Sequence, residues 1–243
     1  NYTASETVLG GYLMWSQNLS DKLTLLAGLR VENTSIDYTG NVLENEEDLI
    51  STASATDNYT NFLPGVHLKY DVTDNFVLRG AWTNTIARPN YYDLVPFQDI
   101  RPDDEELILG NAELVPTTSM NFDLMAENYF ASIGLVSGGV FYKNIDNFIY
   151  TTVNENFVDA DRTGGAEWTR FQPANGGTAT LFGTEIAIQR QLDFLPGALK
   201  GLGVYFNYTY TNSTATGIRN EDGEERDDVG LPDTAPHMVN ASL

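Results

Sequence analysis

Apolar and polar residues alternate along most of this chain with a period of two, the pattern that places successive side chains on opposite faces of a β-strand. In residues 76–84 one face has Phe76, Leu78, Gly80 and Trp82, and the other has Val77, Arg79, Ala81 and Thr83. The pattern predicts nine strands, at residues 6–18, 23–38, 58–70, 76–87, 117–130, 133–152, 178–194, 202–216 and 237–243. Helical periodicity is scarce, and a turn or two of helix is expected only within residues 103–109.

Charged residues such as Arg79 and Asp123 lie on the polar face, deep within the predicted strands. That face would meet bulk solvent in a soluble sandwich and a water-filled lumen in a wide barrel, so alternation alone leaves both architectures open. Several strands exceed about twelve residues, against a usual five or six, which favours a wall that crosses a membrane. Aromatic residues near the strand ends suit a girdle at a membrane interface, but they also suit ordinary cross-strand packing.

The connections between the predicted strands alternate between short and long. The short ones are residues 19–22, 71–75, 131–132 and 195–200, and the long polar ones are residues 39–57, 88–116, 154–177 and 217–236. Outer-membrane barrels have tight periplasmic turns and long extracellular loops, whereas a soluble sandwich mixes turns and loops at both ends. The rhythm therefore predicts an all-β fold, an antiparallel up-and-down transmembrane β-barrel segment.

The composition excludes several classes of function. With 13 Lys and Arg against 34 Asp and Glu, the net charge is −21, which repels phosphate backbones and argues against a nucleic-acid partner. There is no cysteine, so thiolate metal sites are excluded. His67 and His237 are interpreted as strand residues rather than metal ligands, no cofactor is expected, and no nucleophile motif of a hydrolase is present. Acidic runs in the long loops are interpreted as solvated charge, with calcium binding as the alternative.

Several runs resemble the barrel of TonB-dependent outer-membrane receptors: residues 21–32, 78–89, 92–96, 110–119 and 140–149. In the run Gly110-Asn111-Ala112-Glu113-Leu114-Val115-Pro116, Ala112 replaces the proline that is usual in the family pattern. The resemblance implies about nine strands of a 22-stranded barrel in the bacterial outer membrane. Such a barrel is closed by a plug and imports a scarce nutrient (a siderophore, vitamin, oligosaccharide or peptide) with energy from the inner membrane.

The family's plug, its N-terminal energy-coupling segment and its final strands have no counterpart here, so residues 1–243 are expected to be a partial barrel domain of a longer receptor. The partners implied by the resemblance are outer-membrane lipid, the nutrient, the TonB complex through the missing N-terminal segment, and a possible surface lipoprotein. Enzymatic activity is not expected.

Two long loops have the side chains best suited to bind a nutrient. The candidate residues are Arg88, Asn90, Tyr91, Tyr92 and Asp93 in the loop 88–116, and Trp168 and Arg170 in the loop 154–177. Aromatic faces combined with planar hydrogen-bonding groups suit sugars or peptides. The alternative is that these aromatic side chains pack the loop onto the barrel rim.

Two rival functions remain open from the sequence. A soluble or surface all-β carbohydrate-binding or adhesin module could have the same hairpins, but it would be soluble without detergent. A soluble β glycosidase needs two carboxylates at a defined separation, and nothing in the sequence pairs Asp123 with Glu185.

Overall fold

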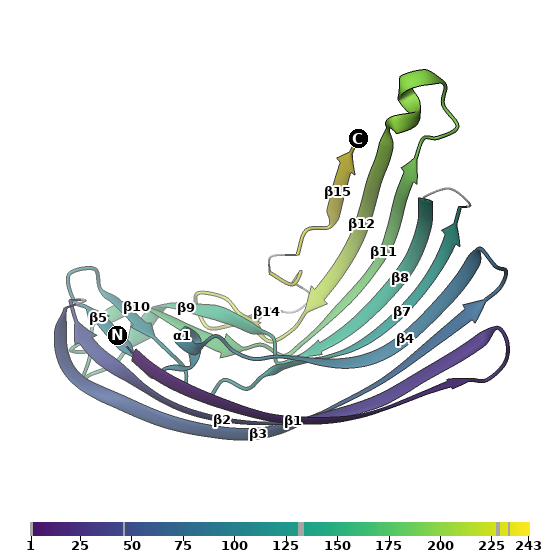
Figure 1. Ribbon diagram of the computed structural model, residues 1–243. Helices are drawn as coiled ribbons and strands as arrows, with labels where there is room; N and C mark the ends of the chain where they lie inside the picture. Colours follow the sequence, from purple (N-terminus) through teal and green to yellow (C-terminus); the bar gives the residue numbers. More distant parts are fainter. Residues whose placement is uncertain (1, 46, 131–133, 227–228, 233) are drawn as a thin grey trace.

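One curved sheet makes up most of the computed structural model, which describes residues 2–45, 47–130, 134–226, 229–232 and 234–243 (Figure 1). Nine long strands of the described chain pair antiparallel in sequence order: β1 (Tyr2–Asn18), β2 (Leu23–Glu44), β3 (Asp48–Asp71), β4 (Phe76–Ala87), β7 (Thr117–Tyr129), β8 (Gly134–Asp146), β11 (Thr178–Gln191), β12 (Gly203–Ala215) and β15 (His237–Ser242). We call these nine strands the wall. They confirm the predicted up-and-down order.

Shorter elements fill the long connections. They are the helix α1 (Tyr91–Leu94) and the strands β5 (Gln98–Arg101), β6 (Glu106–Leu109), β9 (Ile149–Val158), β10 (Glu167–Asn175), β13 (Ile218–Arg219) and β14 (Glu225–Arg226). A 3-10 helix at Gly197–Gly201 lies in the short connection between β11 and β12. None of the helices that the structure describes has the length and apolar character needed to cross a membrane.

The apolar face of the wall, which we call the outer face, is bare. Strand register places Trp82, Phe122, Tyr142 and Phe182 in one row across four neighbouring strands. Phe122 remains 45% exposed and Leu124 57% exposed, because no second sheet among the described residues covers this face. A sandwich would bury both side chains in a dry centre, so the bare row identifies a surface made for lipid hydrocarbon.

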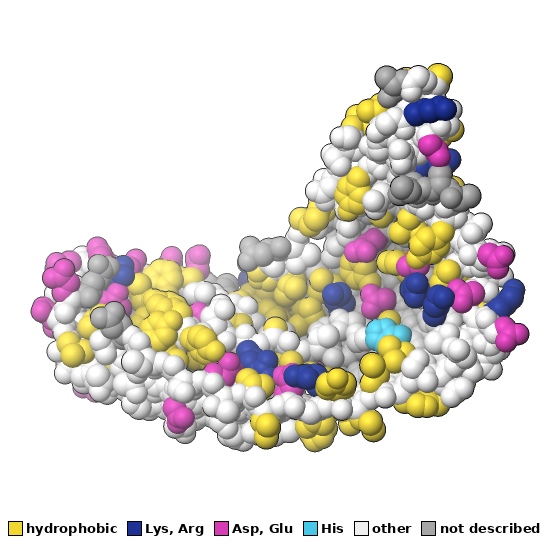
Figure 2. All heavy atoms as spheres, in the orientation of Figure 1, with side chains coloured by type: hydrophobic (Ala, Val, Ile, Leu, Met, Phe, Trp, Pro, Cys, Tyr) yellow, Lys and Arg dark blue, Asp and Glu magenta, His cyan; other side chains and the backbone are white. Residues whose placement is uncertain are grey.

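The opposite face, which we call the inner face, has the charged side chains and is concave. Arg79 on β4 forms an ion pair with Glu127 on β7 at 3.0 Å between Nε and Oε2, and Asp123 lies on the same face of β7. Figure 2 shows Lys, Arg, Asp and Glu side chains gathered in the hollow of the sheet. This is the arrangement expected of a water-filled lumen.

The prediction of a polar loop at residues 39–57 is wrong, because β2 and β3 continue as a regular hairpin through most of that segment. Within the segment Val42 is buried, and so is Tyr38 immediately before it. The pairing of β3 with β4, in contrast, begins at Gly65 and Thr83, one residue after Pro64. Proline has no N–H for a ladder, so the hairpin separates from the rest of the wall at this position.

Three other expectations require correction. The predicted strand 133–152 is broken after Asp146, since Asn147 adopts a positive φ of 58° and the chain turns into β9. The helical turn expected within residues 103–109 is absent from the described chain, where the segment instead closes the β5–β6 hairpin through Glu105 at φ 55°. The chain between β11 and β12 is longer than the predicted turn 195–200. The predicted turn at residues 131–132 lies outside the described residues, as do three residues of the acidic runs: Glu46, Asp227 and Asp228.

Candidate ligand site in the loops

The long connections fold over the concave side of the wall, at the end opposite to its short turns (Figure 1). The hairpin β5–β6 extends the edge of β2, because β5 pairs in parallel with residues 42–44 of that strand. β6 then pairs in parallel with β10, and β10 pairs antiparallel with β9. Backbone hydrogen bonding therefore joins two loops, 88–116 and 154–177, into one layer.

A small apolar core fixes this layer to the inner face of β2. Ile36 and Tyr38 are 2% and 3% exposed and contact Leu94, Val95 and Leu114 from the loop 88–116. The hydroxyl of Tyr38 also donates to the backbone carbonyl of Ala112 at 3.1 Å. Burial of such apolar side chains is worth about 1.5–3 kcal/mol each, so this core contributes substantially to holding the layer on the wall.

Close packing at this contact requires glycine at position 40. A Cβ on Gly40 would lie 2.6 Å from Cγ1 of Val95 and 2.7 Å from the backbone nitrogen of Phe97. A larger residue on β2 would therefore force the loop off the wall.

Arg88 joins the beginning of the loop to two strands of the wall. Its guanidinium forms an ion pair with the buried carboxylate of Glu32, donates to Thr34 Oγ1 at 3.1 Å and lies 3.6 Å from Glu6 on β1. Tyr91 donates its hydroxyl to the same Glu6 at 2.8 Å. That hydrogen bond to a carboxylate raises the pKa of Tyr91. Arg88 and Tyr91 thus hold the loop against the wall.

The remaining predicted residues of this loop lie around α1. Asn90 donates to Asp93 Oδ2 at 3.3 Å. Tyr92 packs its ring 4.6 Å from that of Phe97 and 6.5 Å from that of Tyr2, yet it remains 54% exposed. Partial burial raises the pKa of Tyr92. Tyr92 is therefore both a packing residue and an accessible aromatic face.

Trp168 and Arg170 lie in β10 and contact the protein more than the solvent. Trp168 is 7% exposed, and the guanidinium of Arg170 stacks 4.6 Å above the ring of Phe157. Burial lowers the pKa of Arg170, and its Nε has no hydrogen-bond partner among the described residues. Both side chains support the loop layer from within.

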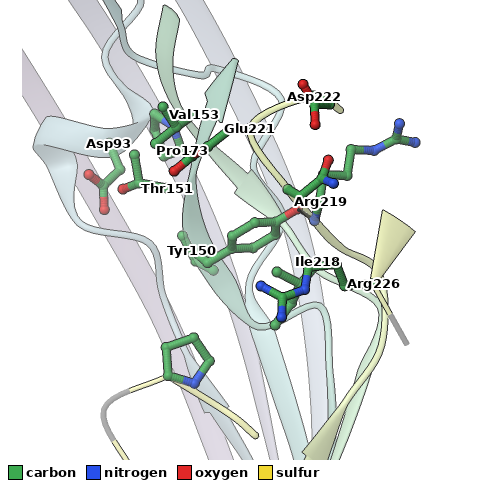
Figure 3. A pocket seen from close by; sticks show the side chains of 13 residues that line it. Asp93, Tyr150, Thr151, Val153, Pro173, Ile218, Arg219, Glu221, Asp222 and Arg226 are labelled. Atoms are coloured by element: carbon green, nitrogen blue, oxygen red, sulfur yellow. Dashed lines mark hydrogen bonds between the residues drawn. The ribbon is translucent and has the colours of Figure 1, made fainter. Parts of the chain in front are cut away.

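A cavity of about 690 Å³ opens between the two joined loops and the segment 217–236 (Figure 3). Its volume is within the usual range for small-molecule sites. The residues that line it include Asp93, Tyr150, Pro173, Ile218, Arg219, Glu221 and Arg226. It lies on the inner face, because Tyr150 and Ile218 pack against a buried core that includes Ala179 and Ala215 at the loop ends of β11 and β12.

Charges of both signs meet in this cavity. Asp93 approaches from the α1 side, while Arg219 and Arg226 come from the β13–β14 hairpin on the opposite side (Figure 3). Within the described residues neither arginine forms an ion pair, although Arg219 donates to the carbonyl of Gly223 at 3.0 Å. A guanidinium that has no ion pair and lies beside an open cavity is suited to bind an anionic group, and Glu221 and Asp222 in the same lining supply acceptors for donor groups.

The floor of the cavity is fixed by Tyr150. Its hydroxyl donates to the carbonyl of Gly217 at 3.1 Å and accepts from the backbone N–H of Arg219 at 3.0 Å. The described part of the chain has no group of three His, Cys, Asp or Glu residues that could hold a metal ion. The chemistry available is therefore an aromatic floor between opposed charges.

Of the seven residues predicted as a site, Asp93 is the one that lines this cavity, and the others lie in the layer beside it. The sequence reasoning missed Tyr150, Arg219 and Arg226. It treated Tyr150 as part of an aromatic girdle and the segment 217–236 as an acidic run. The signal that could have found them is the presence of arginines within a strongly acidic loop.

A curved antiparallel wall with a bare apolar face and a charged hollow defines the wall of a transmembrane β-barrel. The chain belongs to the family described as TonB dependent receptor-like, beta-barrel, whose model matches residues 1–243. No curated protein sequence matched the chain.

Solved structures of similar fold include the copper transporter OprC, with a TM-score of 0.68 and 16% identity over 98% of this chain and 32% of that one. The siderophore receptor PiuA from Acinetobacter baumannii has a TM-score of 0.62 and 13% identity over 98% and 31%. The alcaligin outer-membrane receptor FauA from Bordetella pertussis has a TM-score of 0.57 and 16% identity over 98% and 34%. The chain thus spans about a third of each, and the likeness shows the fold.

Proposed function

We propose that this chain forms part of the wall and the extracellular loops of a TonB-dependent transporter in the bacterial outer membrane. The transporter imports a scarce nutrient with energy relayed by the TonB complex of the inner membrane. The observation that supports this most is the combination of a bare apolar outer face with loops folded over a charged inner face. Lipid covers the first and the nutrient passes along the second.

The rival soluble adhesin or carbohydrate-binding module fits the outer face poorly. Phe122 and Leu124 are exposed on β7, and Phe182 and Ile186 are exposed on β11, the two strands that flank β8. Soluble proteins seldom leave so large a contiguous apolar patch uncovered, because it would drive aggregation.

The cavity between Asp93 and Arg226 is the proposed site of first capture. An aromatic floor with a carboxylate and guanidinium groups suits a chelate or peptide that has both acidic and donor groups. The names of the similar structures, a copper transporter and receptors for siderophores, support a metal chelate as the first nutrient class to test. Tyr92 offers a second contact at the rim, and a surface lipoprotein could cover the loops from outside.

The test uses the full-length receptor in cells that lack other receptors for iron chelates. Uptake is measured with radiolabelled iron as one hydroxamate and one catecholate chelate. We expect TonB-dependent uptake of at least one chelate, and a decrease of roughly 10- to 100-fold in Arg226→Gln and in Asp93→Asn, as for the loss of one charged hydrogen bond. The matched control is Arg162→Gln, since Arg162 forms an ion pair with Asp159 and does not line the cavity.

Two results would contradict this proposal. Recovery of the receptor as a soluble protein without detergent would contradict the proposal that the strands form a transmembrane wall. Uptake that is equal in Arg226→Gln, Asp93→Asn and the wild type would exclude the cavity as the capture site. It would not affect the proposal that the strands form a transmembrane wall.

A further inference from the structure

Strand register divides the cations of the wall unequally between its two faces. The Lys and Arg residues in the described wall strands are Arg30, Lys69, Arg79, Lys143 and Arg190. The first four lie on the inner face, as shown by the direct pairs of Lys69 with Arg79 and of Lys143 with Asn121, and by the ion pair of Arg30 with Glu32, which also binds Arg88 of the loop. Arg190 is two and four residues from Ile188 and Ile186, so it lies on the outer face.

Arg190 lies at the edge of the outer face nearest to the short turns. It is the last residue but one of β11, at the end opposite to the ligand-site loops. In a barrel with this orientation that end is periplasmic, so Arg190 lies where hydrocarbon gives way to headgroups. A guanidinium at this depth can extend toward water while its stem remains in the apolar layer.

The side chain of Arg190 lies between the rings of Phe130 and Phe194, in a position that we call its seat. The guanidinium carbon lies 4.5 Å from the ring centre of Phe130 and 4.9 Å from that of Phe194. A Cβ on Gly134, the direct partner of Arg190 on β8, would lie 3.2 Å from the Cγ of Arg190 and 3.1 Å from Cδ2 of Phe130. Glycine at position 134 therefore leaves room for the stem of the arginine between the strands.

The charge in this seat is uncompensated. Arg190 forms no ion pair with any residue in the described part of the chain, and its Nε is buried without a hydrogen-bond partner. Phe194, whose ring forms one side of the seat, is 63% exposed, and Leu199 on the same connection between β11 and β12 is 49% exposed. A cation flanked by exposed apolar side chains matches a molecule that has an anionic head and an apolar tail.

We propose that Arg190, seated between Phe130 and Phe194, binds the phosphate of a glycerophospholipid in the periplasmic leaflet. The guanidinium donates to phosphate oxygens, for which its planar fork is suited. The rings of Phe130 and Phe194 contact the glycerol backbone and the upper acyl chains. The site anchors the wall at a fixed depth in the membrane.

The experiment is native mass spectrometry of the full-length receptor, purified in detergent and titrated with dioleoylphosphatidylglycerol. We expect Arg190→Gln to weaken lipid binding about fivefold, the effect typical of one cation beside an anionic lipid. Arg190→Lys retains the charge and should bind more tightly than Arg190→Gln. The matched control is Lys143→Gln, which removes an inner-face cation and should bind the lipid as the wild type does.

A second variant keeps the proposal testable if Arg190→Gln fails to fold. Gly134→Val leaves the arginine in place but fills its seat, so it should weaken lipid binding as Arg190→Gln does. Retention of wild-type lipid affinity by both Arg190→Gln and Gly134→Val would overturn the proposal. Equal binding of dioleoylglycerol, which has no phosphate, would reduce the site to an apolar contact, and displacement of the lipid by equimolar inorganic phosphate would make it a free-phosphate site.

Discussion

The ion pair of Arg88 is expected to decide whether the loop 88–116 stays on the wall. Replacing Arg88 with Gln removes the positive charge that faces Glu32 and Glu6, together with the hydrogen bonds to Thr34. The rest of the loop core is unchanged by this substitution. The expected effect is therefore a local opening of the loop and not unfolding of the barrel.

The size of the effect follows from the burial of the two partners. The side chain of Arg88 is 26% exposed and that of Glu32 is 10% exposed, so the pair is well shielded from water. Breaking a fully buried pair costs about 3–5 kcal/mol, but Glu32 keeps its second partner, Arg30, which lowers the cost to about 2 kcal/mol. An opening free energy smaller by about 2 kcal/mol corresponds to an opening population roughly 30-fold larger.

Hydrogen–deuterium exchange of the full-length receptor measures this opening directly. The amides of Val95, Gly110 and Asn111 are protected by loop hydrogen bonds to Tyr91, Phe97 and Asp93 at 3.0, 3.1 and 2.7 Å. In Arg88→Gln their exchange should become roughly 30-fold faster. The control variant Arg79→Gln breaks an ion pair on the same face but far from the loop, and it should leave these amides unchanged.

Two outcomes would refute this reasoning. Exchange at Val95 and Gly110 that changes by less than about threefold would show that the apolar core alone holds the loop. Acceleration of the wall strands β7 and β8 to the same extent as the loop would show that Arg88 supports the whole barrel.

Three further predictions concern the same layer. Gly40→Ala should speed exchange in the loop, since its Cβ would meet Val95 at 2.6 Å, whereas Gly138→Ala, whose Cβ would lie 3.7 Å from its nearest neighbour, should leave the loop exchange unchanged. Alanine at Tyr92 should weaken nutrient uptake by removing an exposed aromatic contact, and alanine at Trp168 should weaken it by loosening the loop layer, while both variants still reach the outer membrane; unchanged uptake in both would remove Tyr92 as a contact and Trp168 as a support of the site. The pKa of Tyr91 is raised, so its contribution to loop docking is full below the ordinary tyrosine pKa and is lost as the pH rises through the raised value. Absorbance titration against Tyr91→Phe should locate that step above the ordinary pKa.

The sequence alone determined the wall. In residues 76–84 the alternation assigned each side chain to a face, and the structure places Trp82 beside Phe122 on the bare outer face as expected. The assignment succeeds because hydrocarbon favours apolar side chains while the lumen accommodates charged ones. Alternate positions of each strand therefore differ in polarity according to the environment that they face.

In the loops, the alternation of polar and apolar residues no longer predicts the structure. Residues 39–57 are as polar as a loop, yet they form strands over most of their length, because a segment about fifty residues further along the chain packs on Tyr38 and Gly40. No local pattern announces such a cover. Only the tertiary contact shows that one face of this hairpin is buried.

The candidate site depended on the tertiary structure most of all. Asp93, Tyr150 and Arg226 come from three different connections, and they face one cavity only because β6 pairs with β10 and a small core holds Leu94 against Ile36. The sequence specified the individual side chains and the wall that presents them. These side chains come together only when the separate loops pack against one another. That packing depends on the shape and burial of segments far apart in the chain, which local sequence patterns do not encode.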